Sequence, residues 1–484
     1  METPGLSASS GLTPGLEGAG TLGAIVEDSP RSSAERLVVL TVVLGTMLAP
    51  LNSTMIAIAL PGIMDEFDAG LASAGWLVTA YLIAMASLQP VAGKIGDRLG
   101  RRRIMLGGIA LFGIASLAAA AAPDLWALVF FRLLQAVAGA LVMPNGAALV
   151  RELVPEERRG RVFGLIGAAV ALAAASGPPL GGVLVEAAGW RAIFYVNLVL
   201  VLPAFLMGWR GLPPSRAAVS RAGFDVKGAI MLTGVLAGTA ALLMSIGQGA
   251  TLQVPAMGAP AVIAMATLFV WHEFRHPDPV VRPRLFQQRA FAAANAGIGL
   301  RNLSMYTLLL SVPLLLAGRN GFSSLETGLV LTALSAAMVI VSPFGGQLAD
   351  RFGRRLPTTI GGAILALGAL PMALAGVDIT LPFLVAGLVT VGIGIGLSTP
   401  GLQTTAVESV GKQEAGVASG IFSTSRYLGS IVGSAILAGA LGAGRDDVDG
   451  IGLVFLIVFV AAVLSTVATL GLRARPEVYS GEEN

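Results

Sequence analysis

Three arginines lie inside long apolar stretches of this 484-residue sequence, where charged side chains are otherwise missing. They are Arg132, Arg301 and Arg426, each several residues away from the nearest polar stretch. A guanidinium stays protonated at ordinary pH, so it cannot load and release a proton, but it can bind an anion or tune a nearby carboxylate. The alternative is a structural role, in which each arginine donates to backbone carbonyls or extends toward the end of its stretch.

Acidic partners for these arginines are not evident, because all 28 acidic residues fall in tails, loops or the ends of the apolar stretches. Carboxylates at such ends are more typical of solvated loop charges than of proton carriers; here they are Asp65, Glu152, Glu186, Glu326 and Glu408. Asn52 cannot titrate either, although its amide can donate and accept hydrogen bonds. We expect polar side chains of the apolar stretches to line a substrate cavity: Asn52, Arg132, Gln135, Asn145, Arg301, Asn302, Tyr306 and Arg426, with Tyr81, Gln89, Gln403 and Tyr427 as further candidates.

The apolar stretches dominate the composition. Only 12% of the residues are charged and 55% are hydrophobic, whereas soluble proteins carry about 25% charged residues. Fourteen segments of about 18–25 residues are each long enough to cross a bilayer as a helix. Because they are continuous rather than alternating, we predict an all-α membrane protein with 14 transmembrane helices. The expected spans are 37–60, 74–93, 103–122, 125–148, 162–185, 192–210, 227–247, 254–271, 291–317, 326–348, 357–376, 380–404, 416–440 and 450–472.

This composition excludes a soluble enzyme, a secreted scaffold and a nucleic-acid binder, which would each need far more polar surface. Cysteine is absent, so disulfides, thiolate metal sites and cysteine nucleophiles are excluded. The two histidines, His272 and His276, fall in one short polar linker, so we expect no metal site and no cofactor. Neither a G-x-x-x-x-G-K-[ST] loop nor a Ser/His/Asp arrangement occurs, so we expect no ATP use, no catalytic residues and no enzyme activity.

The basic residues predict the orientation in the membrane. Of 31 Lys and Arg residues, 25 fall in the two tails and in alternate loops on one side, three fall in spans, and three (Arg191, Arg319 and Arg445) fall on the other side. Basic loops stay in the cytoplasm, so we expect a multi-pass protein of the cell membrane with both termini cytoplasmic. Residues 1–36 are rich in Gly, Ser, Pro and Thr, and we predict that they form a disordered cytoplasmic tail, with a second tail at 473–484.

An internal repeat divides the chain. Residues 93–102 read GKIGDRLGRR and residues 346–355 read GQLADRFGRR, each directly after an apolar segment. The repeat predicts six-helix bundles at 37–210 and 291–472, separated by a linker at 211–290 that carries two inserted helices. In parallel halves of this kind, the substrate site lies between the halves near the middle of the membrane.

The fifth segment has a distinctive run of small residues. Glycines at 164, 167, 177, 181 and 182 leave a smooth face on which another helix can approach closely. Pro178 and Pro179 remove backbone donors and bend the helix. A bend beside a close helix contact can act as a pivot and seal a pathway; ordinary packing of small residues is the alternative.

These segments resemble the major facilitator superfamily, in its fourteen-helix drug:proton antiporter branch. The repeated block resembles motif A, G-x-L-a-D-r-x-G-r-k, and Arg132 to Gln135 resemble motif B, R-x-x-Q-G. Residues 177–182, GPPLGG, resemble the antiporter motif C, and residues 189–197, GWRAIFYVN, resemble the W-R-x-I-F-x-x-N stretch that opens helix 6. Residues 425–429, SRYLG, are similar to the R-x-x-G stretch of helix 13.

The resemblance implies roles for two motifs. Motif A implies a gate on the cytoplasmic face, formed by Gly93, Asp97, Arg98, Gly100 and Arg101, and in the second half by Asp350, Arg351, Gly353 and Arg354. Motif C implies a pivot that seals the pathway, formed by Gly177, Pro178, Pro179, Gly181 and Gly182. This sequence departs from the family where the helix 1 Asp is replaced by Asn52, the helix 1 Asn by Ala57, and the motif B Gly by Ala136.

The resemblance implies a secondary active transporter that exports hydrophobic or amphipathic compounds, as in multidrug efflux, by alternating access driven by the proton gradient. Because Asn52 replaces the titratable residue, a lipid or metabolite exporter or facilitator not coupled to protons through helix 1 is the alternative. A receptor that kept the fold and lost transport is a third reading. The expected partners are an amphipathic small molecule, protons and the bilayer, without nucleic acid, and the expected state is a monomer. Arginines without an acid in the cavity favour anionic, zwitterionic or neutral substrates over lipophilic cations.

Overall fold

The computed structural model describes residues 30–214, 225–247, 253–277, 279–411, 414–440 and 450–472, and within these residues every regular element is helical. The all-α fold predicted from the sequence is thereby confirmed.

The first half comprises α1 Pro30–Glu66, α2 Leu71–Ala74, α3 Trp76–Leu99, α4 Arg101–Ala120, α5 Leu125–Leu153, α6 Glu156–Ala188, α7 Ala192–Tyr195 and α8 Asn197–Gly211. The inserted pair comprises α9 Val226–Gly247 and α10 Gln253–Arg275. The second half comprises η1 Pro283–Gln287, α11 Arg289–Asn320, α12 Ser324–Phe352, α13 Arg355–Ala375, η2 Gly376–Asp378, α14 Leu381–Glu408, α15 Ala415–Ala440 and α16 Gly450–Thr469. Of the predicted tail 1–36, residues 30–36 belong to α1, so the disorder predicted for them is wrong, and residues 1–29 lie outside the described residues, as does the predicted tail 473–484.

Among the described residues, 13 helices are long and apolar enough to cross a membrane. The remaining long helix, α15, has 26 residues and carries several serines and Arg426 among its apolar positions. It packs along both α11 and α9, each of which is one of these helices, so it completes a set of fourteen.

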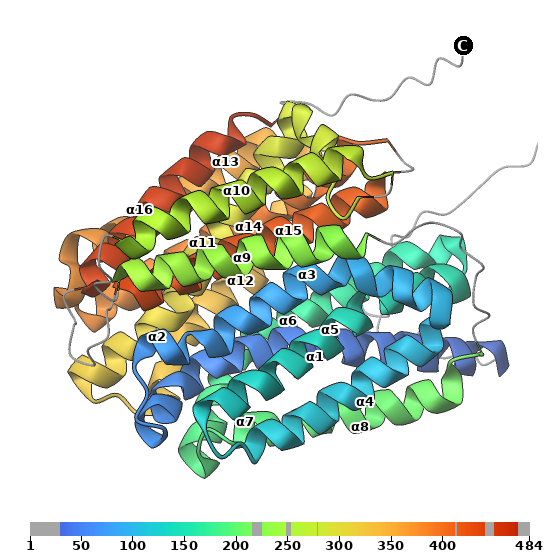
Figure 1. The fold of residues 1–484 in the computed structure, drawn as a ribbon, viewed down its shortest axis with the longest axis horizontal. Coiled ribbons are helices and arrows are strands. Elements are labelled where there is room, and N and C mark those ends of the chain that lie inside the picture. Colours follow the sequence, from blue (N-terminus) through green and yellow to red (C-terminus); the bar gives the residue numbers. More distant parts are fainter. Residues whose placement is uncertain are drawn as a thin grey trace, which may run out of the picture.

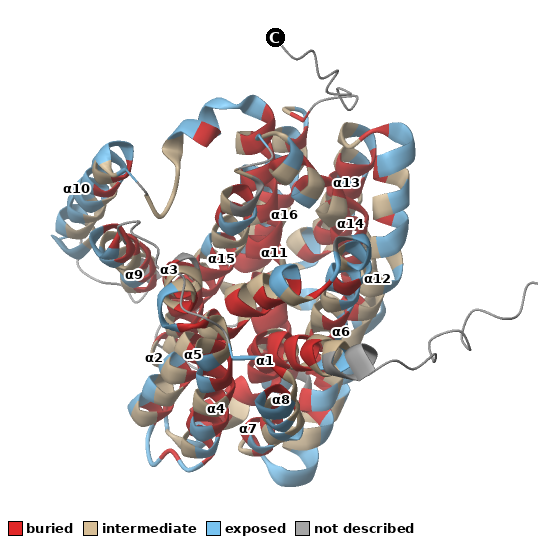
Figure 2. Ribbon diagram, turned by 90° about the vertical axis from the view of Figure 1, so that its right-hand side faces the viewer, coloured by how far each residue is buried: buried red, intermediate tan, exposed pale blue. Residues whose placement is uncertain are grey.

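The two halves lie side by side with the inserted pair against the seam between them (Figure 1). Helix α9 packs against α3 of the first half and α15 of the second half, so it covers the seam. Helix α10 packs mainly on α9 and forms the outermost, mostly exposed element (Figure 2). A transmembrane helix with so little protein contact must face lipid over most of its surface.

Glycines with positive φ make the turns of the repeated block. Gly100 has a φ of 95° between α3 and α4, and Gly353 has a φ of 79° between α12 and α13. Because side chains other than glycine rarely adopt such angles, the repeat preserves the sharp turn that starts the third helix of each half. The turns bring the arginines of the two blocks to the first positions of the following helices.

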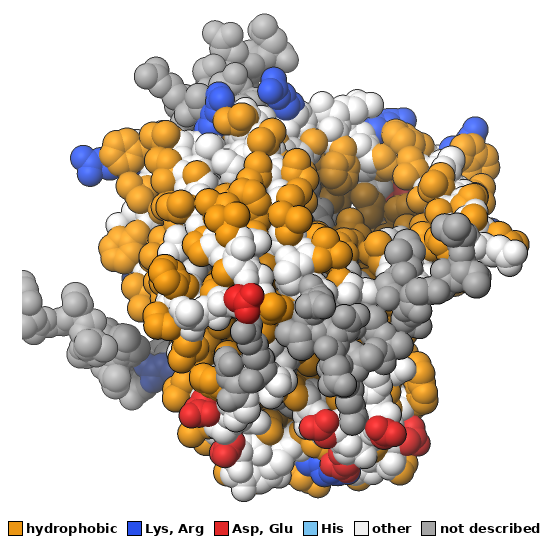
Figure 3. All heavy atoms as spheres, turned by 90° about the vertical axis from the view of Figure 1, so that its left-hand side faces the viewer, with side chains coloured by type: hydrophobic (Ala, Val, Ile, Leu, Met, Phe, Trp, Pro, Cys, Tyr) orange, Lys and Arg blue, Asp and Glu red, His pale blue; other side chains and the backbone are white. Residues whose placement is uncertain are grey.

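The surface separates into an apolar belt and charged ends. Large hydrophobic side chains are exposed along most helices, as expected for contact with lipid. Figure 3 views the end of the molecule away from the start of α1, where acidic side chains gather. Exposed acids at this end include Asp65 and Glu66, at the end of α1, and Asp68 and Asp124, in the loops that follow α1 and α4.

Candidate functional site

A cavity of about 700 Å³ lies between the two halves. Helices α1, α3, α5 and α6 line one side of it, α14 and α15 line the other, and the segment after α10 contributes Pro279 and Val280. Lys94 and Arg151 lie near the ends of α3 and α5, on the side of the membrane where α1 begins. The cavity therefore belongs to that side of the seam.

Four charged side chains line this cavity: Lys94, Arg151, Asp225 and Arg426. Gln89 and Gln403 add neutral hydrogen-bonding groups on opposite sides. Burial raises the pKa of Asp225, but hydrogen bonds from His272 and from the backbone N–H of Gly228 outweigh it and leave that pKa below its ordinary value. The cavity thus combines three bases with one acid that remains ionised.

Side-chain hydrogen bonds close the other end of the seam. The hydroxyls of Thr79 on α3 and Ser434 on α15 lie 2.9 Å apart. The hydroxyls of Ser53 on α1 and Tyr306 on α11 lie 2.9 Å apart. The Gln89 amide donates to Tyr427 at 3.3 Å, where the cavity begins. Since one end of the seam is closed and the other holds the cavity, the structure is one of the two conformations that an alternating-access cycle requires.

The motif C glycines lie at a close contact between the halves. An ideal Cβ on Gly182 would lie 2.8 Å from the carbonyl oxygen of Ser324, at the start of α12. A Cβ on Gly328 of α12 would lie 2.5 Å from the carbonyl oxygen of Pro178. The neighbours are backbone atoms, which cannot move aside as a flexible side chain can. Only glycine at these positions allows α6 and α12 to approach this closely.

Two further motif C glycines pack on α1 within the first half. Gly177 faces the Thr54 side chain, and a Cβ on Gly181 would lie 3.3 Å from the Cα of Met55. In contrast, the glycines at 164 and 167 have nothing within 4 Å of an ideal Cβ. The smooth face predicted over the whole helix is therefore confined to the part that contains Pro178 and Pro179, where α6 meets α1 and α12.

The first motif A block holds α3, α4 and α5 together. Arg101 pairs with Asp97, with Nη2 at 2.8 Å from the carboxylate, and reaches Glu152 at the end of α5 at 3.4 Å. It also donates to the carbonyl of Ala148 at 3.3 Å. Gly96 packs directly against the side chain of Asn145 on α5. These contacts all lie within the first half.

The second motif A block repeats this arrangement. Arg354 forms a bidentate pair with Glu408 at the end of α14, with Nη2 at 2.7 Å from Oε1. The pairs Arg101–Glu152 and Arg354–Glu408 occupy equivalent places in the two halves. Asp350 is exposed, and the guanidinium of Arg351 lies 5.4 Å from the ring of Phe352. In this conformation Arg101 and Arg354 each connect helices of their own half, and these ion pairs do not join the two halves.

Asn52 and Gln135 lie in a hydrogen-bond network inside the first half. The Asn52 amide donates to Gln135 Oε1 at 3.1 Å, and Gln135 donates to Ser116 at 2.8 Å. Asn197 donates to both Asn52 and Ser116, at 3.3 and 3.2 Å. All four side chains are fully buried. The structure therefore places Asn52 and Gln135 in the core of the first half instead of in the cavity.

Arg132 is part of the same core. It donates to the carbonyl of Leu77 at 3.3 Å and to Gln135 Oε1 at 3.4 Å, and its guanidinium lies 4.4 Å from the ring centre of Tyr81. These are the structural contacts that the sequence left open as the alternative to a cavity role. The face of the Tyr81 ring and the carbonyl oxygens of Leu77 and Gln135 stabilise the guanidinium in place of a carboxylate.

Arg301 is buried in the second half, between α11, α13 and α16. It donates to the carbonyl of Thr358 at 3.0 Å, and its Nε and Nη1 groups have no hydrogen-bond partner. Asn302 donates to the carbonyl of Ile298 within its own helix, at 3.1 Å. Neither side chain lines the cavity between the halves. Arg301 instead packs between the helices of the second half.

The predicted cavity residues therefore separate into three groups. Arg426 lines the cavity, and its guanidinium lies 5.4 Å from the ring of Tyr427. Tyr306 lies on the closed part of the seam. The others lie inside one half: Asn52, Arg132, Gln135, Asn145, Arg301 and Asn302.

Three charges of the cavity were not predicted from the sequence. Lys94 and Arg151 carried only the signal of cytoplasmic loop charges, and Asp225 lies two residues before the predicted span 227–247. A second missed feature lies at the closed end, where Arg191 donates to both carboxylate oxygens of Glu66, at 2.7 and 2.6 Å. Trp190 also donates to Glu66, at 2.7 Å. The W-R-x-I-F resemblance marked Trp190 and Arg191, so this motif was the available signal.

The family model described as Major Facilitator Superfamily matches residues 42–434, and a second match covers residues 296–484. The chain belongs to the major facilitator superfamily. The resemblance seen in the sequence is confirmed at the level of this family. The protein is therefore a multi-pass membrane transporter.

Relatives support this assignment over most of the chain. An uncharacterised transporter of this family from Bacillus subtilis (YvkA) is 34% identical over 92% of this chain and 97% of its own length. The tetracenomycin C resistance and export protein of Streptomyces glaucescens is 31% identical over 84% of this chain and 76% of its own. The multidrug resistance protein Stp of Mycobacterium tuberculosis is 32% identical over 83% of this chain and 74% of its own.

Solved structures share the fold at low sequence identity. A bacterial homologue of the human lysosomal transporter Spinster, in an inward-facing and unoccupied conformation, matches with a TM-score of 0.66 at 15% identity. That match covers 92% of this chain and 98% of the other. The human organic anion transporter MFSD10 matches with a TM-score of 0.60 at 20% identity, covering 91% of this chain and all of the other.

Proposed function

We propose that the protein exports hydrophobic or amphipathic compounds from the cytoplasm by alternating access, in exchange for protons. The observation that carries this proposal is the seam: a cavity on one side and a closed contact through the motif C glycines on the other. Export is supported by two relatives whose names describe tetracenomycin C export and multidrug resistance. Exchange for protons is supported by the resemblance of GPPLGG at 177–182 to the antiporter motif.

The proposed orientation places the cavity on the cytoplasmic side of the cell membrane. The basic loops and both termini share that side under the positive-inside rule. Substrate enters the cavity from the cytoplasm or from the inner leaflet, and rocking of the halves then opens the other end of the seam. The protein acts as a monomer, since one chain contains both halves and the complete cavity.

The charges of the cavity favour substrates that are anionic, zwitterionic or neutral. Lys94, Arg151 and Arg426 face the cavity, and among the described residues that line it Asp225 is the one acid. Charges at the edge of a low-dielectric cavity act on a bound charge more strongly than they would in water. A lipophilic cation would meet a net positive lining, whereas an anionic amphiphile would gain from it.

The test is transport into proteoliposomes with an imposed pH gradient. The panel holds an anionic, a neutral and a cationic amphiphile of similar size. We expect transport of the anionic and neutral compounds to depend on the pH gradient, with the cation transported least. Arg426→Gln should lower transport of the anion by about tenfold, which corresponds to about 1.4 kcal/mol. The matched control is Arg161→Gln on α6, an exposed arginine outside the cavity lining, which should leave transport unchanged.

The results also distinguish the alternatives. Preferred transport of the cation, with Arg426→Gln without effect, would overturn the assignment of substrate charge. Transport that follows only the substrate gradient would favour a lipid or metabolite facilitator and would contradict proton exchange. In the second case Asn52→Asp, which restores the acid of the family motif, tests whether a titratable group at this position introduces a response to the pH gradient.

A further inference from the structure

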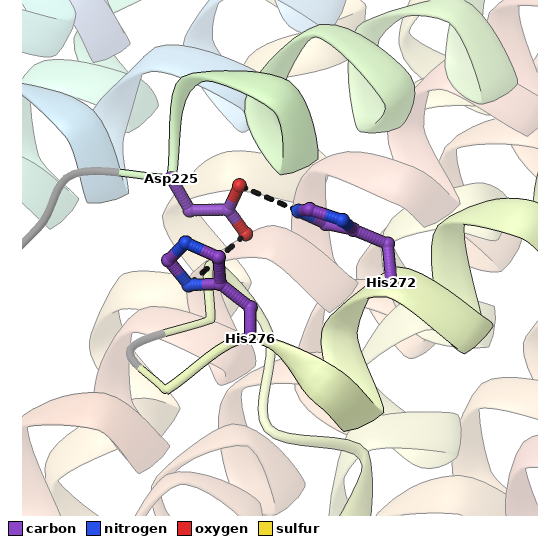
Figure 4. A group of neighbouring side chains, drawn as sticks. All are labelled: Asp225, His272 and His276. Atoms are coloured by element: carbon purple, nitrogen blue, oxygen red, sulfur yellow. Dashed lines mark hydrogen bonds and ion pairs between the residues drawn. The ribbon is translucent and has the colours of Figure 1, made fainter.

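Two histidines and two carboxylates meet where the inserted helix pair begins and ends. Asp225 directly precedes α9, and His272 and His276 come from the last turn of α10 and its continuation (Figure 4). His272 Nε2 lies 2.7 Å from Asp225 Oδ1, and His276 Nδ1 lies 3.7 Å from Asp225 Oδ2. The absence of a metal site was predicted because both histidines fall in one short linker and the sequence gives no sign that Asp225 lies beside them.

The spacing of the two histidines suits a shared ligand. The backbone N–H of His276 donates to the carbonyl of His272 at 2.9 Å, so the helical turn continues and both rings face the same side. One nitrogen from each ring and one carboxylate oxygen of Asp225 all lie within 4.8 Å of one another. Ligands at about 2.0–2.1 Å from a tetrahedral Zn²⁺ lie about 3.4 Å apart. In the structure the 2.7 Å contact of His272 and the 3.7 Å contact of His276 run to different oxygens of Asp225. Because the three ligand atoms all lie within 4.8 Å of one another, side-chain shifts of up to about 1.5 Å bring them to the spacing of a tetrahedral site.

Two buried carboxyl groups lie beside the histidines. Asp225 and Glu273 are each only 2% exposed. Asp225 Oδ2 and Glu273 Oε1 have no hydrogen-bond partner, and both are the nearest atoms to an ideal Cβ on Gly228. Two carboxylate oxygens thus face each other over a glycine, away from water. Such a pair is unfavourable unless a proton or a cation lies between or beside them.

We propose that Asp225, His272 and His276 bind a divalent transition-metal ion with the chemistry of Zn²⁺. Two imidazoles and one carboxylate are a donor set for zinc, cobalt or nickel, and a poor one for calcium or magnesium, which prefer oxygen ligands. Three protein ligands leave one position for water. Glu273 accepts from the backbone N–H of Val281 at 2.5 Å and places a second carboxyl group beside the ion.

The place of the site in the fold gives the ion a defined effect. Asp225, Pro279 and Val280 line the seam cavity, so the ion would join the two ends of the helix pair at the cavity wall. It would also neutralise the one acid among the charges of the cavity. This second effect rests on the proposed function, whereas binding of the ion does not.

The test uses the full chain purified with an affinity tag that contains no histidine. Because the chain has only two histidines, any imidazole site must involve these residues. After equilibration with limiting Zn²⁺ and removal of free metal, we expect one zinc ion per chain by mass spectrometry. Cobalt in place of zinc should give the visible absorption bands of a four-coordinate site. Asp225→Asn and His272→Ala should each weaken zinc binding by at least tenfold, and Glu186→Gln, at an exposed acid of α6, should not.

A measurement without substitutions guards against variants that fail to fold. Zn²⁺ should raise the Tm of the wild-type chain, whereas the same concentration of Mg²⁺ should not, and the zinc effect should be lost in His276→Gln. The proposal is overturned if the wild-type chain retains no zinc, or if the variant lacking both histidines retains as much. Transport is not needed for any of these readings, so failure of this proposal and failure of the proposed export function are distinguishable.

Discussion

Gly182→Ala should shift the transporter toward the conformation that is open at the end now closed. The added Cβ would lie 2.8 Å from the carbonyl oxygen of Ser324 and 3.2 Å from the Cα of Leu325. Reaching an ordinary contact of roughly 3.5 Å requires α6 and α12 to separate by about 0.7 Å. Overpacking of this kind costs about 1–3 kcal/mol. The cost falls on the present conformation, because the contact between these two helices joins the halves only while this end is closed.

A penalty of about 1–3 kcal/mol changes a two-state equilibrium by about 5–150-fold. The absence of cysteine makes this change measurable, since one introduced thiol has no background. Thr79→Cys places that thiol at a fully buried position of the closed seam, opposite Ser434. In right-side-out vesicles, a membrane-impermeant maleimide should label Thr79→Cys about 5–150-fold faster when Gly182→Ala is also present.

The matched control is Gly164→Ala on the same helix, where an added Cβ meets nothing within 4 Å. It should leave the labelling rate unchanged, although it makes the same replacement in the same sequence motif. If Gly182→Ala and Gly164→Ala label at the same rate, the contact between α6 and α12 does not hold the seam closed. The assignment of motif C as the seal would then be refuted.

Three further outcomes follow from the contacts. Thr79→Cys combined with Ser434→Cys should form a disulfide on oxidation, because the native hydroxyls are 2.9 Å apart. Transport should then stop until a reductant is added. Transport that continues with the disulfide formed would contradict rocking at this seam. Gln135→Leu should lower the Tm of the purified protein, because loss of the amide leaves buried polar groups unpaired at about 1–3 kcal/mol each. Gln135→Glu still accepts from Asn52 and Arg132 and should lower the Tm less. A larger fall in Tm for Gln135→Glu than for Gln135→Leu would refute the network. Glu152→Gln and Glu408→Gln should change stability by less than about 1 kcal/mol and leave the response of transport to the pH gradient intact, since both carboxylates are about half exposed to solvent. A lost pH response in either variant would identify that acid as a proton carrier.

The fold was predictable because the bilayer imposes simple rules on a sequence. Long apolar runs become helices, and a repeated ten-residue block reveals two halves. The ends of the helices were harder to predict. Helix α1 extends over Pro30–Glu66, although hydropathy indicated only 37–60. Polar residues continue the helix beyond the apolar core, and nothing in their hydropathy separates a helix end from a loop.

The positions of side chains within the bundle were less predictable. In a soluble helix, polarity distinguishes the outer face from the core, but in a membrane the lipid-facing surface is as apolar as the interior. Charge in the middle of a span therefore indicated that Arg132 and Arg301 face protein, without indicating which protein surface. The structure places both in contacts within one half, where carbonyl oxygens accept from them.

Contacts between residues far apart in the sequence also differ in how predictable they were. Arg101 and Glu152 are 51 residues apart, and Arg354 and Glu408 are 54 apart. The similar separations in two repeated halves were a signal in the sequence that could have identified both pairs. Asp225 and His272 are 47 residues apart and occur once, in the inserted pair that has no counterpart. Nothing in the linear sequence could relate them.

The interactions within each half and those between the halves together explain how the molecule can move. On the side of the cavity, the pairs Arg101–Glu152 and Arg354–Glu408 connect helices of the same half, so they persist while the halves rotate. At the closed end, the side-chain hydrogen bonds Ser53–Tyr306 and Thr79–Ser434 cross the seam, and each contributes only about 1 kcal/mol net. Breaking these two bonds therefore costs about 2 kcal/mol, which is within the range that differential binding of a substrate can supply. The packing of α6 on α12 adds to this cost. Helix α9 contacts both α3 and α15, so it must slide on at least one half during the change, and any ion that fixes the base of the α9–α10 pair acts directly on that motion.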